Sequence, residues 1–370
     1  MLSARRLPGT VPVHAHSSDP REDRIRDALA LRRWALPALT GAGEPAPAVS
    51  EGGWSTFLSV ERCGLALLPL GPAVLGSGAA IVRRRAAAES QRVLSAAAQL
   101  RRIAKLARND GRGGVVVLKG GVPLAEGRPG MDVVDVDVLA PPAEAQALGA
   151  ALDATGFVAR GRASSHRLAE RMEAAAVTVE IHTGVPGIAG AEEFMSRARA
   201  TSVAGLRAPH PEDHLWHLLL HGVTQHAGRR GNLRELAVLV DALGRCTPED
   251  VARVQARVEA RNDASALRAH LSLAEELRAR RVGEGDPFRD VAAVAYTLVE
   301  YLAPVRLHGA LKFAVWETTF LTLARRAGTG PIPEGTGMLR QVVRRMPEWA
   351  LTPPALLLAR RARRIAANSP

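Results

Sequence analysis

The sequence predicts an α+β fold, in which a small mixed β-sheet has helices packed behind it and further helical regions on both sides. Two patterns lead to this prediction. In the middle of the chain, short apolar segments with strand periodicity alternate with helical segments, and such alternation builds a small sheet backed by helices. Before and after this part, apolar residues recur with helical periodicity. We therefore divide the 370 residues into a disordered N-terminus (1–20), an N-terminal helical region (21–110), a core with the sheet (111–208), a helical domain (209–327), and a linker with basic C-terminal helices (328–370).

The N-terminal part of the chain predicts helices and no secretion signal. Residues 1–20 are polar, contain prolines and histidines, and lack the apolar core of a signal peptide. Periodicity predicts helices over residues 21–34, 54–68 and 79–107, with a loop rich in Gly, Pro and Ala over 41–53.

Residues 64–82 form an uncharged apolar run long enough to span a membrane. Pro69, Pro72 and several glycines interrupt the run, and three arginines beginning at Arg83 end it. We favour a pair of buried helices joined by a proline-containing turn, and we expect no stable membrane insertion.

The core begins with an apolar strand, 115–118, which runs into the turn Lys119-Gly120-Gly121 and a short helix over 122–126. Glycines allow the backbone to approach a phosphate closely, and a helix N-terminus presents free N–H groups to an anion. Lys119 is one of three lysines in a chain rich in arginine, so its place in this turn suggests a phosphate contact. The sequence thus predicts a nucleotide-binding turn at Lys119, Gly120 and Gly121.

Two further strands carry carboxylates on one face. Asp135 and Asp137 are two residues apart in a strand, so they share a face and lie roughly 7 Å apart by strand rise. The segment 177–182 repeats the pattern, with Glu180 and His182 on its polar face. If these strands are neighbours, three carboxylates meet on one side of the sheet.

Three clustered anions repel one another, and each pKa would rise unless cations lay among them. Hard oxygen ligands without a nearby cysteine suit Mg²⁺ or Mn²⁺. Two such ions can bind the attacking and leaving oxygens of a phosphoryl or nucleotidyl transfer. We therefore predict a two-ion site formed by Asp135, Asp137 and Glu180, with His182 lining the cleft or pairing with a carboxylate.

These motifs resemble the polymerase β-like nucleotidyltransferase superfamily, whose signature is a Gly-Gly or Gly-Ser turn, then Asp-x-Asp, then a third acidic strand residue. Gly120, Gly121, Asp135, Asp137 and Glu180 occupy those places. The resemblance implies the polymerase β-like fold, metal-dependent transfer of a nucleotide, and catalytic roles for the three acids.

More narrowly, the chain resembles a bacterial group usually called uncharacterised nucleotidyltransferases, over about residues 115–245. That group shows Leu-Lys-Gly, Asp-Ile-Asp-Leu-Leu and Val-Glu-Leu-His motifs, followed by a Pro-Glu-Asp helix bearing histidines and a second helix with an aspartate. The matching segments here are Leu118-Lys119-Gly120, Asp135-Val136-Asp137-Val138-Leu139, Val179-Glu180-Ile181-His182, Pro211-Glu212-Asp213 with His217, His221 and His226, and Asp241. Two places depart from the pattern: Met131 stands where the group often has arginine, with Arg128 further upstream, and no aromatic precedes Asp241.

Helical periodicity resumes at residue 211. His214, His217 and His221 share one helix face, which either turns towards the cleft, faces solvent or binds zinc. Asp241 lies in an apolar run, where an acid is usually paired, here with an arginine or one of these histidines. His166 is either an exposed loop residue or a contact to phosphate or acceptor.

Later helices are expected to start at Thr247-Pro248 and to cover 264–280, 286–302 and 311–326. The last helix, 354–367, carries four arginines, which suggests either a solvated face or an RNA or lipid contact.

The net charge of +12 favours polyanionic partners such as RNA, nucleotides or acidic membranes. The two cysteines, Cys63 and Cys246, are far apart and lack any metal-binding spacing, which fits a reducing cytoplasm rather than a disulfide scaffold.

The sequence favours an enzyme that moves a nucleoside monophosphate from a nucleoside triphosphate to a hydroxyl or phosphate, with release of pyrophosphate. The acceptor stays open among an RNA 3′ end, a peptide or protein, and a small molecule. The alternative is a non-catalytic nucleotide-binding or interaction module that keeps the fold.

Overall fold

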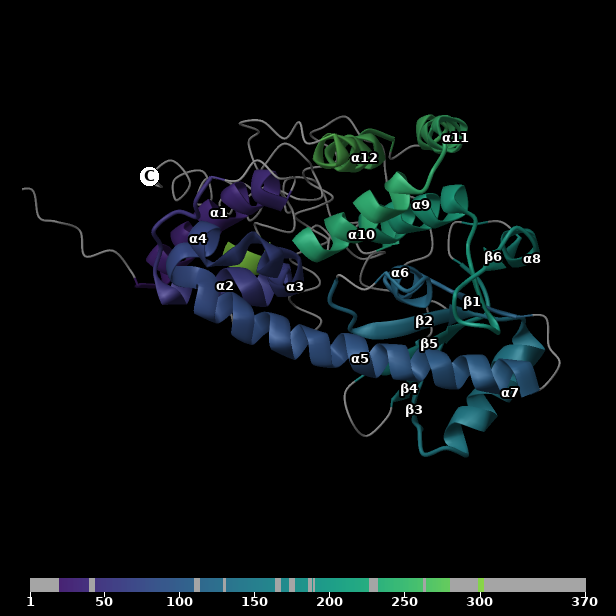
Figure 1. Ribbon diagram of the computed structural model, residues 1–370. Helices are drawn as coiled ribbons and strands as arrows, with labels where there is room; N and C mark the ends of the chain where they lie inside the picture. The colour runs from purple at the N-terminus through teal and green to yellow at the C-terminus, as the bar shows by residue number, and fades with distance from the viewer. Residues whose placement is uncertain are drawn as a thin grey trace, which may run out of the picture.

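The computed structural model has the predicted α+β architecture, a mixed sheet flanked by helices (Figure 1). The structure describes residues 20–39, 44–109, 114–128, 131–163, 168–172, 177–185, 188, 190–225, 232–261, 264–279 and 299–302. The predictions for the N-terminus, His166, His226, the helix over 311–326, the linker and the basic C-terminal helix lie outside these residues, and the helix over 286–302 lies outside them except for its last four positions.

In the described part of the chain before the sheet, the helices are α1 (Pro20–Leu39), α2 (Glu51–Glu61), α3 (Gly64–Leu67), α4 (Gly71–Leu75) and the long α5 (Ala79–Asn109), with 3₁₀ turns at Leu68–Leu70 and Gly76–Gly78. The single helix predicted over 54–68 is wrong. The helix ends at Glu61 because Arg62 adopts a left-handed conformation, with φ 52°, and its N–H bonds the carbonyl of Leu58.

Among the described residues, the stretch Gly64–Arg108 is long and apolar enough to cross a membrane by length and composition alone. Leu67, Leu75 and Val82 of this stretch are buried against Trp54 and Phe57 of α2. Only 22% of its most apolar window is buried, which is less than in a core helix. The expectation of no stable membrane insertion stays a prediction.

The sheet has the strand order β3-β4-β5-β2-β1-β7-β6. Its strands are β1 (Val115–Val117), β2 (Asp135–Leu139), β3 (Val158–Ala163), β4 (Leu168–Met172), β5 (Thr178–His182), β6 (Arg199–Ala200) and β7 (Leu206–Ala208). Strand β2 lies between β5, to which it is parallel, and β1, to which it is antiparallel. The two predicted carboxylate strands are therefore direct neighbours.

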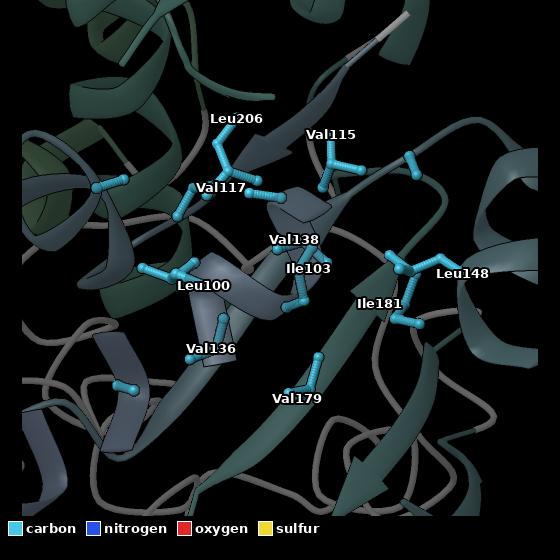
Figure 2. Packing of buried hydrophobic residues seen from close by; sticks show 14 of the residues in the cluster. Leu100, Ile103, Val115, Val117, Val136, Val138, Leu148, Val179, Ile181 and Leu206 are labelled. Atoms are coloured by element: carbon cyan, nitrogen blue, oxygen red, sulfur yellow. The ribbon is translucent and has the colours of Figure 1, made fainter. Parts of the chain in front are cut away.

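One face of the sheet packs against α5 and α7 (Pro142–Asp153). Figure 2 shows the valines of β1 and β2 meeting Leu100 and Ile103 of α5, with Leu148 of α7 beside β5. Burying a Val or Leu side chain stabilises the fold by about 1.5–3 kcal/mol. Because strand side chains alternate, this apolar face directs the polar residues of β2 and β5 to the opposite face.

The short helix α6 (Gly121–Ala125) lies on the same side as α5, because Val122 and Ala125 belong to the core that α5 and α7 share with the sheet. The other face meets α8 (Ala191–Ser196) and α9 (Pro211–Leu219), the last continuing as a π-helix over Leu220–Gln225. Phe194 of α8 packs on Val116, Leu118 and Leu139. Figure 1 shows α9 and α10 (Leu233–Gly244) on the side of the sheet away from α5. The helices α11 (Pro248–Glu259), which starts with the predicted capping box, and α12 (Ala264–Arg278) pack beyond them.

A buried carboxylate joins the N-terminal helices to the C-terminal half. Glu61 accepts hydrogen bonds from Arg32 Nη1 at 2.5 Å, Tyr301 Oη at 2.7 Å and the backbone N of Leu233 at 2.8 Å. Around it, apolar residues of α1 and α2 share one core with residues of α10 and α12.

Candidate active site

The polar face of the two central parallel strands carries the predicted acids. Asp137 is the register partner of Glu180, and Asp135 is the partner of Thr178. Asp137 is buried, whereas the Glu180 side chain keeps 19% of its surface exposed. Two of the three predicted carboxylates therefore lie side by side at the centre of the sheet, with Glu180 facing solvent.

Lys119 and His182 complete a four-residue cluster. Lys119 Nζ lies 2.6 Å from Asp137 Oδ1 and 4.0 Å from Glu180 Oε2. His182 Nε2 lies 2.8 Å from Asp137 Oδ1 and 3.6 Å from Glu180 Oε2. The structure thus brings together four of the seven predicted site residues from β2, β5 and the turn after β1.

The pKa values in this cluster move in directions that follow from charge and burial. Burial alone would raise the pKa of Asp137, but Lys119 and His182 hold it well below its usual range. Burial raises the pKa of Glu180. Burial opposes the charged form of His182, but the two carboxylates raise its pKa above the usual value. Asp137 is therefore the permanent anion of the cluster.

Asp135 shares the strand face of Asp137 but does not belong to the group of close donor atoms. Its charged neighbour is Arg234 of α10, a buried guanidinium. Burial would lower the pKa of Arg234, and the charges of Glu235, Asp135 and Asp132 raise it instead. Asp135 is therefore balanced by a cation different from those at Asp137.

Asp132, three residues before Asp135, is itself buried and paired. Arg92 of α5 donates to its two carboxylate oxygens at 2.7 and 3.0 Å. This two-point contact anchors the chain entering β2 to the long helix.

The turn before α6 has a strained backbone at Lys119, whose φ of +49° lies in the left-handed region. A non-glycine residue there costs on the order of 1–3 kcal/mol. The N–H of Gly121 bonds the Leu118 carbonyl at 3.1 Å, and the N–H of Val122 bonds the Lys119 carbonyl at 3.2 Å. The strained conformation directs the Lys119 ammonium to Asp137.

The two glycines of the turn differ in their surroundings. A Cβ on Gly121 would lie 2.7 Å from Val117 Cγ1, so this position must stay small for α6 to pack on β1. A Cβ on Gly120 would meet nothing within 4 Å. The space beside Gly120 is therefore open to a bound group.

His214 of α9 is hydrogen-bonded to the backbone of the Lys119 turn. Arg245 Nη2 lies 2.6 Å from His214 Nδ1, and an arginine can only donate, so the proton of the neutral ring lies on Nε2. His214 Nε2 in turn donates to the Lys119 carbonyl at 3.2 Å. Burial, with the charge of Arg245, keeps the pKa of His214 well below its usual value, so the ring stays neutral.

His217, one turn further along α9, is buried close enough to feel the charges of Lys119, His182 and Asp137. Burial, with smaller contributions from the charges of Lys119 and His182, lowers the pKa of His217 to about 3. Within the described part of the chain its Nδ1 has no hydrogen-bond partner. The ring of His221 packs edge-on against it at 5.9 Å. The sequence left three interpretations of this histidine face: turned towards the cleft, exposed to solvent, or binding zinc. The positions of His214 and His217 fit the first.

Asp241 is paired with arginines, as its apolar surroundings predicted. Arg128 donates to both of its oxygens, and Arg245 Nε lies 3.3 Å from Oδ2. The same arginines contact Glu126 at the end of α6, together with Arg199 at 2.6 Å. This network ties α6, α10 and β6 together around the Lys119 turn.

The donor atoms suit a hard divalent cation. Carboxylate oxygens of Asp137 and Glu180 and a nitrogen of His182 lie within 4.8 Å of one another. Oxygen ligands of this kind fit Mg²⁺, and the imidazole nitrogen makes Mn²⁺ equally suitable. Among the described residues, a second group of close donor atoms is formed by His210, Glu212 and Asp250. The nitrogens of His214, His217 and His221 do not form such a group, so this geometry does not support the zinc interpretation.

Sequence reasoning missed several residues around the site, namely Arg234, Arg245, Asp132 and Glu126. Arg234 and Arg245 are far from Asp135 in the chain, and no local pattern distinguishes them from the many other arginines. The departure at Met131, where the resembling group often has an arginine, did not identify either residue.

Of the comparisons with known proteins, the one with protein families gave a match. Neither the curated proteins nor the solved structures gave a match to this chain. The model of a family described as uncharacterised nucleotidyltransferase matches residues 73–279, which is more than half of the chain and contains every predicted site residue. The chain therefore belongs to this nucleotidyltransferase family and is a transferase.

Proposed function

We propose that the protein is a divalent-metal-dependent nucleotidyltransferase that uses a nucleoside triphosphate and releases pyrophosphate. The observation that carries this proposal is the register pairing of Asp137 with Glu180, which places two carboxylates beside Lys119 and an imidazole on the polar face of the two central strands.

Asp135, Asp137 and Glu180 would hold two Mg²⁺ or Mn²⁺ ions. When bound, these ions supply neutralising charge at the phosphates and lower the pKa of an attacking hydroxyl. Asp135 lies two residues from Asp137 on the same strand face, so a small movement of its side chain away from Arg234 brings it into the donor group. This movement is part of the proposal.

In the proposed reaction, an acceptor oxygen forms a bond to the α-phosphorus, and the bond from that phosphorus to the bridging oxygen of the β-phosphate breaks. Glu180, the more exposed of the two paired acids and the one whose pKa is raised, helps to take the proton of an attacking hydroxyl. Lys119 and the open side of Gly120 contact the phosphates of the departing pyrophosphate.

The acceptor is an RNA 3′ end, a peptide or protein, or a small molecule. The net charge of +12 supports a polyanionic acceptor but suits the triphosphate itself as well. Salt separates these possibilities, since binding of RNA weakens steeply as salt rises and binding of a small neutral acceptor does not. We place the reaction in the cytoplasm, with which two free, buried cysteines are compatible.

The test is a labelling assay. Each of the four α-labelled nucleoside triphosphates is incubated with pure protein, Mg²⁺ or Mn²⁺, and a lysate of the source cells. Wild type is compared with Asp137→Asn and with Glu192→Gln, a surface acid at the start of α8 that serves as matched control. We expect label on one class of molecule with wild type and Glu192→Gln, and none with Asp137→Asn.

Metal-dependent binding of the triphosphate with no transfer to any acceptor would instead favour the binding module. Transfer by Asp137→Asn at the wild-type rate would overturn the proposed site.

A further inference from the structure

A second site lies outside the catalytic cluster, between α8, α9 and α11. It is a pocket of about 240 Å³. Its walls combine apolar and charged side chains: Ile188, Glu193, Phe194, Arg197, Asp213, Trp216 and Arg257. This volume is below the roughly 300–1,000 Å³ of pockets for drug-sized ligands, so the pocket fits a smaller molecule.

Two adjacent buried acids of α9 flank the pocket, and the first is ion-paired through both of its oxygens. Glu212 is 1% exposed and lies 2.8 Å from Arg197 Nη2, 2.9 Å from Arg253 Nε and 2.5 Å from Arg257 Nη2. Its Oε2 accepts hydrogen bonds from Arg197 and Arg253, whereas its Oε1 has the ion-pair contact with Arg257 but no hydrogen bond among the described residues. Glu212 therefore acts as the centre of a structural ion-pair network.

The second acid, Asp213, is only half engaged. Its Oδ1 accepts from Arg197 at 3.3 Å and, more weakly, from Arg257 at 3.5 Å. Its Oδ2 is buried and has no hydrogen-bond partner in the described part of the protein. Asp213 is 4% exposed and lines the pocket. A buried acceptor without a partner is unfavourable, so a donor from a ligand or a water belongs at this oxygen.

The surroundings restrict what that donor can be. The three arginines are offset by Glu212, Asp213 and Glu193, so the pocket has no excess charge that would select an ion. Phe194, Trp216 and Ile188 give apolar walls. An uncharged flat ring with an N–H donor satisfies both the walls and the open Asp213 oxygen.

The pocket is also linked to the catalytic turn. Asp213 is followed on α9 by His214, which donates to the Lys119 carbonyl. Phe194 packs on Leu118, the residue before Lys119. A ligand in the pocket therefore contacts the two elements that hold the catalytic turn in place.

We propose that this pocket binds a nucleobase, with Asp213 Oδ2 accepting a hydrogen bond from a ring or exocyclic N–H. The choice of a nucleobase among uncharged heterocycles rests on the proposed nucleotidyl transfer. The base belongs either to the donor nucleotide or to the acceptor.

The experiment is calorimetric titration of the full chain with adenosine, guanosine, cytidine and uridine, which lack phosphates. We expect at least one nucleoside to bind wild type and Asp137→Asn equally well. Asp213→Asn should weaken that binding about tenfold or more, since it removes a charged acceptor. Ile188→Trp, which fills the pocket without changing the ion pairs, should abolish it, and circular dichroism checks the fold of both variants.

A repeat at saturating magnesium and non-hydrolysable triphosphate identifies the source of the base. Competition assigns the pocket to the donor nucleotide, and simultaneous binding assigns it to the acceptor. The proposal is overturned if no nucleoside binds wild type, which would leave a water at Asp213. It is also overturned if Asp137→Asn abolishes binding while Asp213→Asn and Ile188→Trp do not. Nucleosides that bind in this way without any nucleotidyl transfer would instead count against the proposed function alone.

Discussion

His214 Nε2 lies 3.2 Å from the carbonyl oxygen of Lys119, so a neutral imidazole of α9 is bonded to the backbone of the residue whose ammonium contacts Asp137. Because Lys119 has a left-handed backbone, the turn needs such external support. The support comes from the helical domain, far along the chain from the turn itself. Helix α9 therefore supports the turn that we propose to contact the phosphates.

Replacing His214 by leucine should impair the turn more than the fold. The Lys119 carbonyl and Arg245 each lose a partner, which should lower the free energy of unfolding by about 1–3 kcal/mol. We expect the KM for the triphosphate to rise, because the Lys119 ammonium is no longer directed to one position. His214→Gln keeps a side-chain donor and should recover part of the loss. Equal KM values for wild type and His214→Leu would contradict this role.

Replacing Lys119 by methionine should change metal and nucleotide binding in opposite directions. A cation and the Lys119 ammonium are both attracted to Asp137, so removal of the ammonium should tighten Mn²⁺ binding in the absence of nucleotide, as measured by electron paramagnetic resonance titration. The affinity for the triphosphate should fall by about tenfold, because a charged phosphate contact is lost. Lys105→Met, on the exposed side of α5, is the matched control and should alter neither quantity. Weaker Mn²⁺ binding in Lys119→Met would refute the competition.

The strand periodicity in the sequence was sufficient to predict that Asp137, Glu180 and His182 share one face, because a period of two leaves a strand with one buried face little freedom. The pairing of β2 with β5 was only a condition of the predicted carboxylate site, and the structure supplies it. The partners of these acids could not be predicted in this way. Arg234 lies on a helix whose docking depends on the whole tertiary structure.

The break in the helix predicted over 54–68 shows a second limit. Arg62 takes a left-handed conformation that a non-glycine residue rarely adopts, and no glycine or proline marks the position. The Glu89 carboxylate accepts from the N–H of Leu65 at 2.8 Å, so a contact from α5 stabilises the chain after the break. Local propensity alone contains no information about that contact.

The ion pair at Glu61 should be important for stability because it is buried. Glu61→Gln leaves the Arg32 guanidinium without its charged partner, and breaking a buried pair typically costs about 3–5 kcal/mol. Glu51, which lies 3.3 Å from Arg84, is the matched control, since both of those side chains are largely exposed. Glu51→Gln should change the free energy of unfolding by less than about 1 kcal/mol. Urea denaturation measures both, and similar values for the two variants would show that the Glu61 junction is not structural.

Buried neutral histidines should make the protein sensitive to acid. The pKa of His217 is about 3 in the folded protein and near its usual 6.5 in the unfolded chain. Below about pH 6.5 the unfolded chain therefore binds a proton at this residue that the folded protein does not, so stability falls as the pH drops towards 3. His214, whose pKa is also lowered, acts in the same direction.

His182 has the opposite sign and does not cancel this effect. Its raised pKa stabilises the folded protein fully below 6.5 and loses that contribution as the pH rises through the folded value. In the acid window its contribution is constant. Between about pH 6.5 and 4.5, His217 and His214 should each contribute up to about 1.4 kcal/mol per pH unit to the slope of stability against pH, and the raised pKa values of Glu180 and Asp213 oppose this slope in its lower part. The substitution His217→Gln, measured by urea denaturation across this window, should remove the contribution of one proton to the slope, up to about 1.4 kcal/mol per pH unit. An unchanged slope would mean that His217 is not held neutral in the folded protein.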